Sequence, residues 1–167
     1  FDQLRWRVLV AGAVLWRIAR RPFALERLGR GARDSGGRWN RIGTGVIYAG
    51  CTIGIAALEK FVHLAGIVPR DLVLVRIELA DTSSAEKPAL ADLPKDWALV
   101  PPGPGSMECG TRWARGNRSL VLYVPSALIY EEQNAVLNPA HPDFGAVKMV
   151  VVREFHYDAR FYLPRSR

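Results

Sequence analysis

Three residues that suit chemistry on a dinucleotide follow one another at short intervals in the first half of the sequence. Arg38 is followed ten residues later by Tyr48, and Glu59 lies eleven residues beyond Tyr48. Arginine offers a planar fork for a pyrophosphate, tyrosine a face for a cationic ring, and glutamate a fixed negative charge. If the elements that carry these residues converge, the pattern predicts a site for a dinucleotide such as NAD.

The arginine of this set lies in the segment GRGARDSGGRWN, from Gly29 to Asn40. Glycine lets the backbone approach a ligand closely, so we expect an irregular loop of the kind that suits phosphate. The segment is neither a GxGxxG fingerprint nor a P-loop, because no Gly-Lys-Ser/Thr follows it. On composition alone, a solvated basic loop without a ligand is the favoured interpretation.

The glutamate lies in a segment, residues 53–65, whose apolar side chains recur at helical spacing. Glu59 is three or four residues from Ile55 and Val62, which places it on or beside the apolar stripe of the predicted helix. That position is unusual for a glutamate. The alternative is an exposed carboxylate that pairs with His63 at the next turn.

A serine follows the apolar segment that precedes Val124-Pro125-Ser126. Because proline breaks the ladder, the hydroxyl of Ser126 can point away from the sheet into a site. Pro-Ser is also common turn chemistry. The following EEQNAVLNP, with Asn134, Asn138 and Pro139, is predicted to be a turn region.

Other kinds of chemistry lack support in the sequence. It contains no HExxH, GxSxG or paired-cysteine motif, so metal-dependent and serine hydrolysis are not indicated, and no metal site is predicted. Cys51 and Cys109 lack metal-like spacing and are too few for a disulfide framework. We therefore expect two reduced thiols in a cytoplasmic protein.

The elements that must position these residues are read from apolar patterning. It predicts strands at 13–19, 46–49, 72–79, 120–124 and 147–155, a helix at 53–65 and a weaker helix at 106–114. Residues 81–105 are rich in proline and are predicted to form a long surface loop. Since strands and helices do not alternate regularly, the predicted class is α+β, in a single domain over residues 1–167.

Charge and hydropathy limit the partners. Lys and Arg number 23 against 16 Asp and Glu, a formal net charge of +7, so the surface should attract anions. The longest apolar run, Val8 to Trp16, is far shorter than the roughly 20 residues that cross a bilayer. We expect no membrane-spanning segment.

Several of these motifs together resemble a known family. GARDSGGRWNRIGTGVIYAG, AALEKFVH and LVLYVPSALIYEEQNAVLNPAHPDF are similar to the RES domain, which is named for its arginine, glutamate and serine. The resemblance covers about Leu15 to Asp158. It implies a fold related to ADP-ribosyltransferases, with a mixed α+β core and a central cleft that holds NAD.

The resemblance also implies roles for individual residues. Arg38 would bind the NAD phosphates, Tyr48 would stack near the nicotinamide, Glu59 would be the catalytic carboxylate, and Ser126 would hold the nicotinamide end or orient Glu59. Arg17 would lie on the cleft wall. The further residues expected to contact NAD are Trp39, Asn40, His63 and Asn134.

Members of this family are typically toxins of bacterial toxin-antitoxin pairs. The resemblance therefore implies that NAD is a substrate rather than a prosthetic group and that it is destroyed by hydrolysis or, with phosphate as co-substrate, by phosphorolysis. It also implies an antitoxin partner with an Xre-like helix-turn-helix part. Because some relatives transfer ADP-ribose to a protein, a protein-directed ADP-ribosyltransferase is the alternative.

A non-enzymatic alternative is a basic nucleic-acid-binding module that uses Trp39 and Tyr48 as stacking platforms. Glu59 argues against it, because a nucleic-acid groove gains nothing from a carboxylate beside its aromatic rings. We therefore expect no direct binding to nucleic acid.

Overall fold

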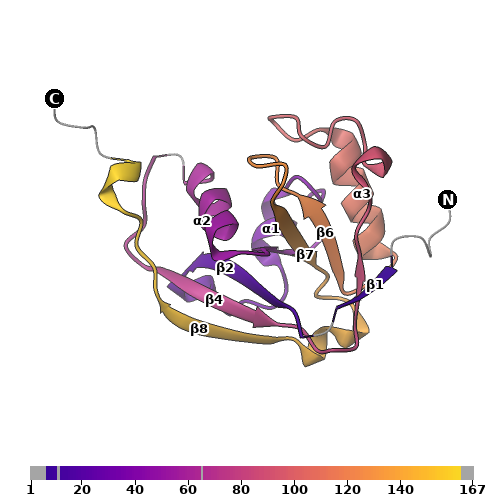
Figure 1. Cartoon of the computed structure of the whole chain (residues 1–167), viewed down its shortest axis with the longest axis horizontal. Coiled ribbons are helices and arrows are strands. Elements are labelled where there is room, and N and C mark those ends of the chain that lie inside the picture. The colour runs from indigo at the N-terminus through magenta and orange to yellow at the C-terminus, as the bar shows by residue number, and fades with distance from the viewer. Residues whose placement is uncertain (1–6, 11, 65, 163–167) are drawn as a thin grey trace.

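The computed structural model describes residues 7–10, 12–64 and 66–162 and confirms the α+β prediction. In that part of the chain, eight strands form one sheet in the order β1-β5-β6-β7-β3-β2-β4-β8 (Figure 1). Strands β5 and β6 pair in parallel, and the other neighbours pair antiparallel. The strands are β1 Arg7–Val10, β2 Val14–Arg20, β3 Ile47–Gly50, β4 Leu72–Glu78, β5 Ser83–Glu86, β6 Val121–Pro125, β7 Gln133–Leu137 and β8 Lys148–Glu154.

Three α-helices accompany the sheet: α1 Arg30–Ser35, α2 Ile53–Val62 and α3 Pro104–Arg115. Short 3₁₀ turns lie at Arg21–Phe23, Leu90–Asp92, Pro142–Ala146 and Ala159–Phe161. The five predicted strands and two predicted helices are confirmed. Helix α2 begins where predicted, since the side chain of Thr52 accepts a hydrogen bond from the backbone N–H of Ile55 at 3.2 Å.

Three predictions about the loops are wrong in part. Residues 81–105 contain strand β5, whose alternating Ser83 and Ala85 are buried together with Glu86. The Glu86 carboxylate pairs with the guanidinium of Arg118 and accepts a hydrogen bond from the hydroxyl of Ser119 at 3.3 Å. The strand was missed because two of its three buried residues, Ser83 and Glu86, are polar, so it lacks the apolar pattern of a buried strand.

The predicted turn after Ser126 is the second correction. Residues 133–137 form β7, which lies between β6 and β3 in the sheet, and only Asn138 and Pro139 follow it as a turn. Of the two polar residues that begin this strand, Asn134 lies on the face of the candidate site, where its amide donates to Glu59. Part of the glycine-rich segment also differs from the expected irregular loop, because Arg30–Ser35 form α1.

The two longer helices lie over the same face of the sheet. Trp113 and Ala114 of α3 pack against Leu122 and Val124 of β6, in a cluster that also holds Trp39. Ala56 of α2 packs in a separate cluster over β2 and β4. Since Trp16, Gly50, Asn134 and Val124 are successive cross-strand partners, they project from one face, and both helix clusters occupy it. The opposite face carries the larger apolar cluster, which includes residues of β2, β4 and β7.

None of the described helices is long and apolar enough to cross a membrane. Cys51 and Cys109 are both free thiols, as predicted, and burial raises the pKa of Cys51 to about 11. These cysteines therefore lack the low pKa that marks a reactive thiolate.

Helix α3 packs closely against the loop that carries Arg38, at Gly110 and Trp39, and this packing leads to a prediction about stability. A Cβ atom at Gly110 would collide with the carbonyl oxygen of Trp39, whereas one at Gly31 in α1 would meet nothing within 4 Å. We expect Gly110→Ala to lower the free energy of unfolding by about 1–3 kcal/mol, because backbone atoms cannot yield cheaply. The matched control Gly31→Ala should be neutral or slightly stabilising. Denaturant unfolding of the two variants tests this, and equal stabilities would contradict the close packing.

Candidate functional site

The carboxylate of Glu59 is held by two side chains from a distant part of the chain. Its Oε1 accepts a hydrogen bond from the hydroxyl of Ser126 at 2.8 Å and another from Nδ2 of Asn134 at 2.5 Å. These residues come from α2, from the end of β6 and from β7. In the part of the chain that the structure describes, Oε2 of Glu59 makes no hydrogen bond, so one carboxylate oxygen is fixed and the other is available to a ligand.

The hydroxyl of Ser126 has its orientation set by the backbone. It accepts hydrogen bonds from the N–H groups of Leu128 at 3.0 Å and Ile129 at 3.3 Å, which leaves its single proton for Glu59. The N–H of Ser126 donates to the carbonyl of Glu132 at 2.9 Å, which closes the turn between β6 and β7. The predicted placement of a hydroxyl directly after the Pro125 strand end is confirmed. The side chain is buried and serves the carboxylate.

Helix α2 can bring Glu59 to β7 because the strand beneath it ends in glycine. A Cβ atom at Gly50 would lie 2.7 Å from the backbone nitrogen of Ala56 and 2.7 Å from Cγ2 of Ile55. Gly50 is the cross-strand partner of Asn134, so the same residue that admits the helix lies beside the amide that holds the carboxylate. The close contact between β3 and α2 therefore determines how near Glu59 lies to Asn134 of β7.

A second polar cluster lies around Tyr48. Its hydroxyl donates to Oδ1 of Asn40 at 2.7 Å and accepts from the backbone N–H of Trp39 at 2.9 Å. Burial raises the pKa of Tyr48 above its ordinary value, so this hydroxyl stays protonated. Tyr48 is the cross-strand partner of Val136, two residues from Asn134 on the same strand. Both side chains therefore leave the sheet on one face, and the two clusters are neighbours.

The other residues of GGRWN support the loop that carries Arg38. Asn40 is fully buried, and its Nδ2 donates to the carbonyls of Ala32, Arg41 and Thr44. Trp39 is only 2% exposed and packs in the cluster under α3. Neither side chain is placed to face a ligand, and Trp39 cannot be the stacking platform that the nucleic-acid alternative requires. Both side chains support the loop, and the contact of Trp39 and Asn40 with NAD stays a prediction.

Arg38 is half-buried and is held by main-chain carbonyls. Its Nη1 donates to the carbonyl of Trp97 at 2.8 Å and to that of Leu99 at 2.7 Å. The ring of Trp97 in turn packs on the ring of Tyr130, with centroids 5.1 Å apart. Sequence reasoning missed Trp97 and Tyr130, because an isolated aromatic residue in a proline-rich loop carries no motif.

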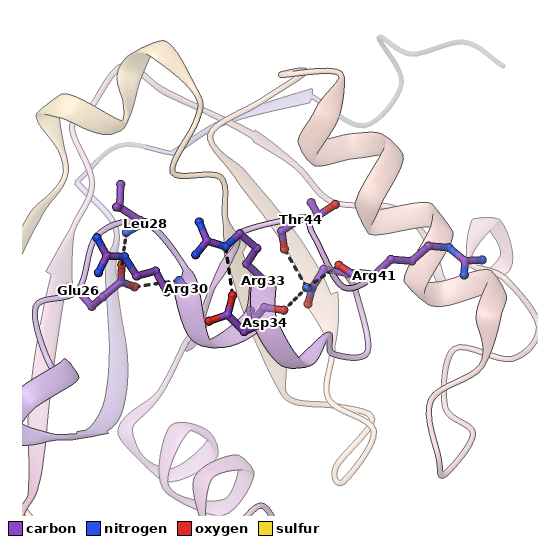
Figure 2. A network of polar contacts seen from close by, with 9 residues as sticks. Glu26, Leu28, Arg30, Arg33, Asp34, Arg41 and Thr44 are labelled. Carbon is purple, nitrogen blue, oxygen red and sulfur yellow. Dashed lines mark hydrogen bonds and ion pairs between the residues drawn. The ribbon is translucent and has the colours of Figure 1, made fainter.

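The neighbouring arginines differ from Arg38 in their partners. Figure 2 shows that Arg33 pairs with Asp34 and that Arg30 lies beside Glu26, which also accepts hydrogen bonds from the backbone of this loop. Arg41 pairs with Glu108 of α3 at 2.8 Å. Among the described residues, Arg38 has no carboxylate partner. The positive charge of Arg38 is thus not balanced by a neighbouring carboxylate and can attract an anion.

Arg17 and His63 are placed less directly. Nη1 of Arg17 is buried and has no hydrogen-bond partner among the described residues, and burial lowers the pKa of this guanidinium. No described contact joins Arg17 to Glu59, so its place in the site stays a prediction. His63 is exposed at the end of α2, and its Nδ1 is 2.6 Å from the carbonyl of Glu59. The alternative pairing of His63 with the carboxylate is therefore not present.

The described residues contain no group of three or more His, Cys, Asp or Glu side chains that could hold a metal ion. The polar groups that converge instead are the carboxylate of Glu59, the hydroxyl of Ser126 and the amide of Asn134, with the guanidinium of Arg38 near Tyr48 of the neighbouring cluster. Such a set binds an uncharged or cationic group at one end, beside Glu59, and an anion at the other, beside Arg38.

Comparisons with known proteins identify relatives along most of this chain. A relative from Sphingobium sp. (strain YBL2), described as "Prs ADP-ribosylating toxin", is 41% identical over 151 residues, which cover 87% of this chain and 94% of that protein. A Yersinia enterocolitica protein named "Toxin Res" is 35% identical over 150 residues, covering 88% of this chain and 98% of that protein. A Pseudomonas putida "Toxin Res" is 36% identical over 154 residues, covering 89% and 99%.

The fold has a counterpart among solved structures. The M. tuberculosis MbcT-MbcA toxin-antitoxin complex contains a chain that matches with a TM-score of 0.67 and 16% identity, over 90% of this chain and 88% of that one. At that identity the likeness concerns the fold alone. The model of the RES domain family matches residues 14–159, close to the range over which the motifs predicted it. The chain belongs to the RES domain family.

Proposed function

We propose that this chain is the toxin of a toxin-antitoxin pair and that it cleaves the bond between nicotinamide and ribose in NAD. The observation that carries the proposal is the carboxylate of Glu59, fixed by Ser126 and Asn134 with one oxygen left free. The names of the curated relatives, which describe toxins and an ADP-ribosylating activity, support it.

The residue types fit the chemistry of this bond. Nicotinamide in NAD is a cationic leaving group that departs neutral, so the general acid that other glycosidases need is unnecessary. The electron pair of the C–N bond leaves with nicotinamide, and positive charge develops on the sugar. Oε2 of Glu59 would face that charge and stabilise the oxocarbenium-like transition state. Because Oε1 is already held, the carboxylate needs no reorientation during the reaction.

Arg38 and Tyr48 would bind the rest of the substrate. The guanidinium of Arg38 has Nε and Nη2 free of described hydrogen bonds and would donate from both to the pyrophosphate oxygens. The hydroxyl of Tyr48 is committed to Asn40, so Tyr48 would offer its ring to the nicotinamide. NAD would then lie across the face of β3 and β7, between the two clusters.

The acceptor of ADP-ribose defines two versions of this function. With water the products are nicotinamide, ADP-ribose and a proton, and with phosphate they are nicotinamide and ADP-ribose 1″-phosphate. The 41% identical relative described as "Prs ADP-ribosylating toxin" favours, as a second candidate, transfer to a protein side chain. Incubation with radiolabelled NAD, with and without phosphate and with a candidate protein, separates these outcomes by chromatography and by label retained on protein.

The first prediction concerns the carboxylate. Glu59→Gln keeps an oxygen that can accept from Ser126 and Asn134 but removes the charge, so nicotinamide release should fall by roughly a thousandfold or more. The melting temperature should stay close to that of the wild type. Glu131→Gln, an exposed neighbour of the β6–β7 turn, is the matched control and should keep full activity. An unchanged rate in folded Glu59→Gln protein would refute the assignment.

A second prediction concerns the phosphate end. Arg38→Lys keeps the positive charge but loses the planar fork, so we expect NAD affinity to fall by about tenfold or more. The control is Arg33→Lys, since Arg33 is exposed and paired with Asp34. Calorimetric titration of both proteins with NAD measures the effect. Equal affinities of the two variants would transfer the phosphate role to another cation.

We also propose that a protein antitoxin with a helix-turn-helix part covers this site in the cytoplasm of the cell that makes the toxin. An enzyme that consumes NAD harms its own cell, and the fold counterpart was solved as a toxin-antitoxin complex. A basic site rim favours an acidic or carboxylate-ended segment of the partner. Saturating partner should abolish nicotinamide release by the purified complex and should still bind Glu59→Gln protein. Undiminished turnover in the saturated complex would exclude this mode of control.

A further inference from the structure

The proline-rich segment after β5 contributes the two acceptors that hold Arg38. Both hydrogens of Nη1 are used, one on the carbonyl of Trp97 at 2.8 Å and one on that of Leu99 at 2.7 Å. The edge that remains is formed by Nε and Nη2, which is the edge that binds two oxygens side by side. The two carbonyls therefore determine how the guanidinium is oriented and leave its Nε and Nη2 edge available to a ligand.

Asp96 ties the segment that carries the Trp97 and Leu99 carbonyls to helix α3. The Asp96 carboxylate accepts hydrogen bonds from the backbone N–H groups of Gly105 at 2.7 Å and Ser106 at 3.2 Å, in the first turn of α3. The N–H of Leu99 donates to the carbonyl of Asp96 at 3.2 Å. One end of the segment is thus tied to a helix.

From the other side, the segment is held by an aromatic contact. The ring of Trp97 packs on that of Tyr130 at 5.1 Å and 59°, and Tyr130 lies in the turn that begins at Ser126. Tyr130 is 56% exposed, so the core gains little from its ring. The contact instead joins the loop that orients Arg38 to the turn that orients Glu59 through Ser126.

We propose that the Trp97–Tyr130 pair is a clamp that positions Arg38 for the pyrophosphate, an inference that rests on the proposed function. The clamp holds the Trp97 and Leu99 carbonyls at a set distance from the β6–β7 turn, so that the free edge of Arg38 is oriented before substrate arrives. Pre-orientation removes the entropy cost of ordering a long side chain on binding. Tyr130 and Trp97 are positioning residues, because they act through Arg38.

The test replaces Tyr130, since Trp97 also packs against the cluster under α3 and its loss would disturb the fold. In a Glu59→Gln background, which cannot consume the ligand, Tyr130→Ala should weaken ADP-ribose binding by up to about tenfold. Binding of nicotinamide riboside, which lacks the pyrophosphate, should not change. Tyr130→Phe keeps the ring and should restore ADP-ribose binding, and the exposed Tyr162→Ala should have no effect.

In active protein, Tyr130→Ala should raise KM for NAD with kcat unchanged. Adding Tyr130→Ala to Arg38→Ala should weaken ADP-ribose binding no further, because the clamp has nothing left to orient. An additive loss in the double variant, or equal weakening for nicotinamide riboside, would show that Tyr130 touches the ligand itself and would overturn the positioning role. Failure of the wild type to bind NAD or ADP-ribose would instead refute the proposed function.

Discussion

The candidate site depends on one carboxylate oxygen that three elements share. Oε1 of Glu59 receives the proton of Ser126 and the amide of Asn134, so α2, the end of β6 and β7 meet at a single acceptor. A half-buried carboxylate that lacked these donors would be costly to keep near the sheet. The absence of a side chain at Gly50, the capped start of α2 and the closed turn after Pro125 all serve to bring the donors within reach.

The two ends of the site are built on different supports. The reactive end rests on sheet and helix, whose hydrogen bonds and packing leave little freedom. The phosphate end rests on loops, where Asn40 secures the loop around Thr44 and the carbonyls of Trp97 and Leu99 hold Arg38. Rigid support suits a charge that must meet a transition state, and at the phosphate end the two carbonyl acceptors supply the corresponding orientation of Arg38.

The sequence predicts the parts of this protein that have regular patterns. The period of apolar residues found β2, β4, β8 and α2. Arg38, Tyr48 and Glu59 could be named from their chemical types and spacing, whereas the role of Ser126 came from the resemblance to the RES domain. The apolar pattern could not predict β5 or β7. Each contains a polar residue, Glu86 in β5 and Asn134 in β7, whose partner lies far along the chain. Trp39 and Asn40 were assigned to the ligand for a related reason. The GGRWN motif identifies a loop of the site, but the motif alone does not show which of its residues stabilise the loop and which would contact a ligand.

The order of strands in the sheet has a consequence for the synthesis of the protein. Glu59 is made 67 residues before Ser126 and 75 residues before Asn134, and β3 pairs with β7 in the middle of the sheet. Such distant contacts form late, because a long loop must close before they stabilise anything. A ribosome-bound chain that has not yet exposed β7 therefore lacks both donors to its carboxylate and the strand beside Tyr48. The candidate site is therefore incomplete until most of the chain has been translated.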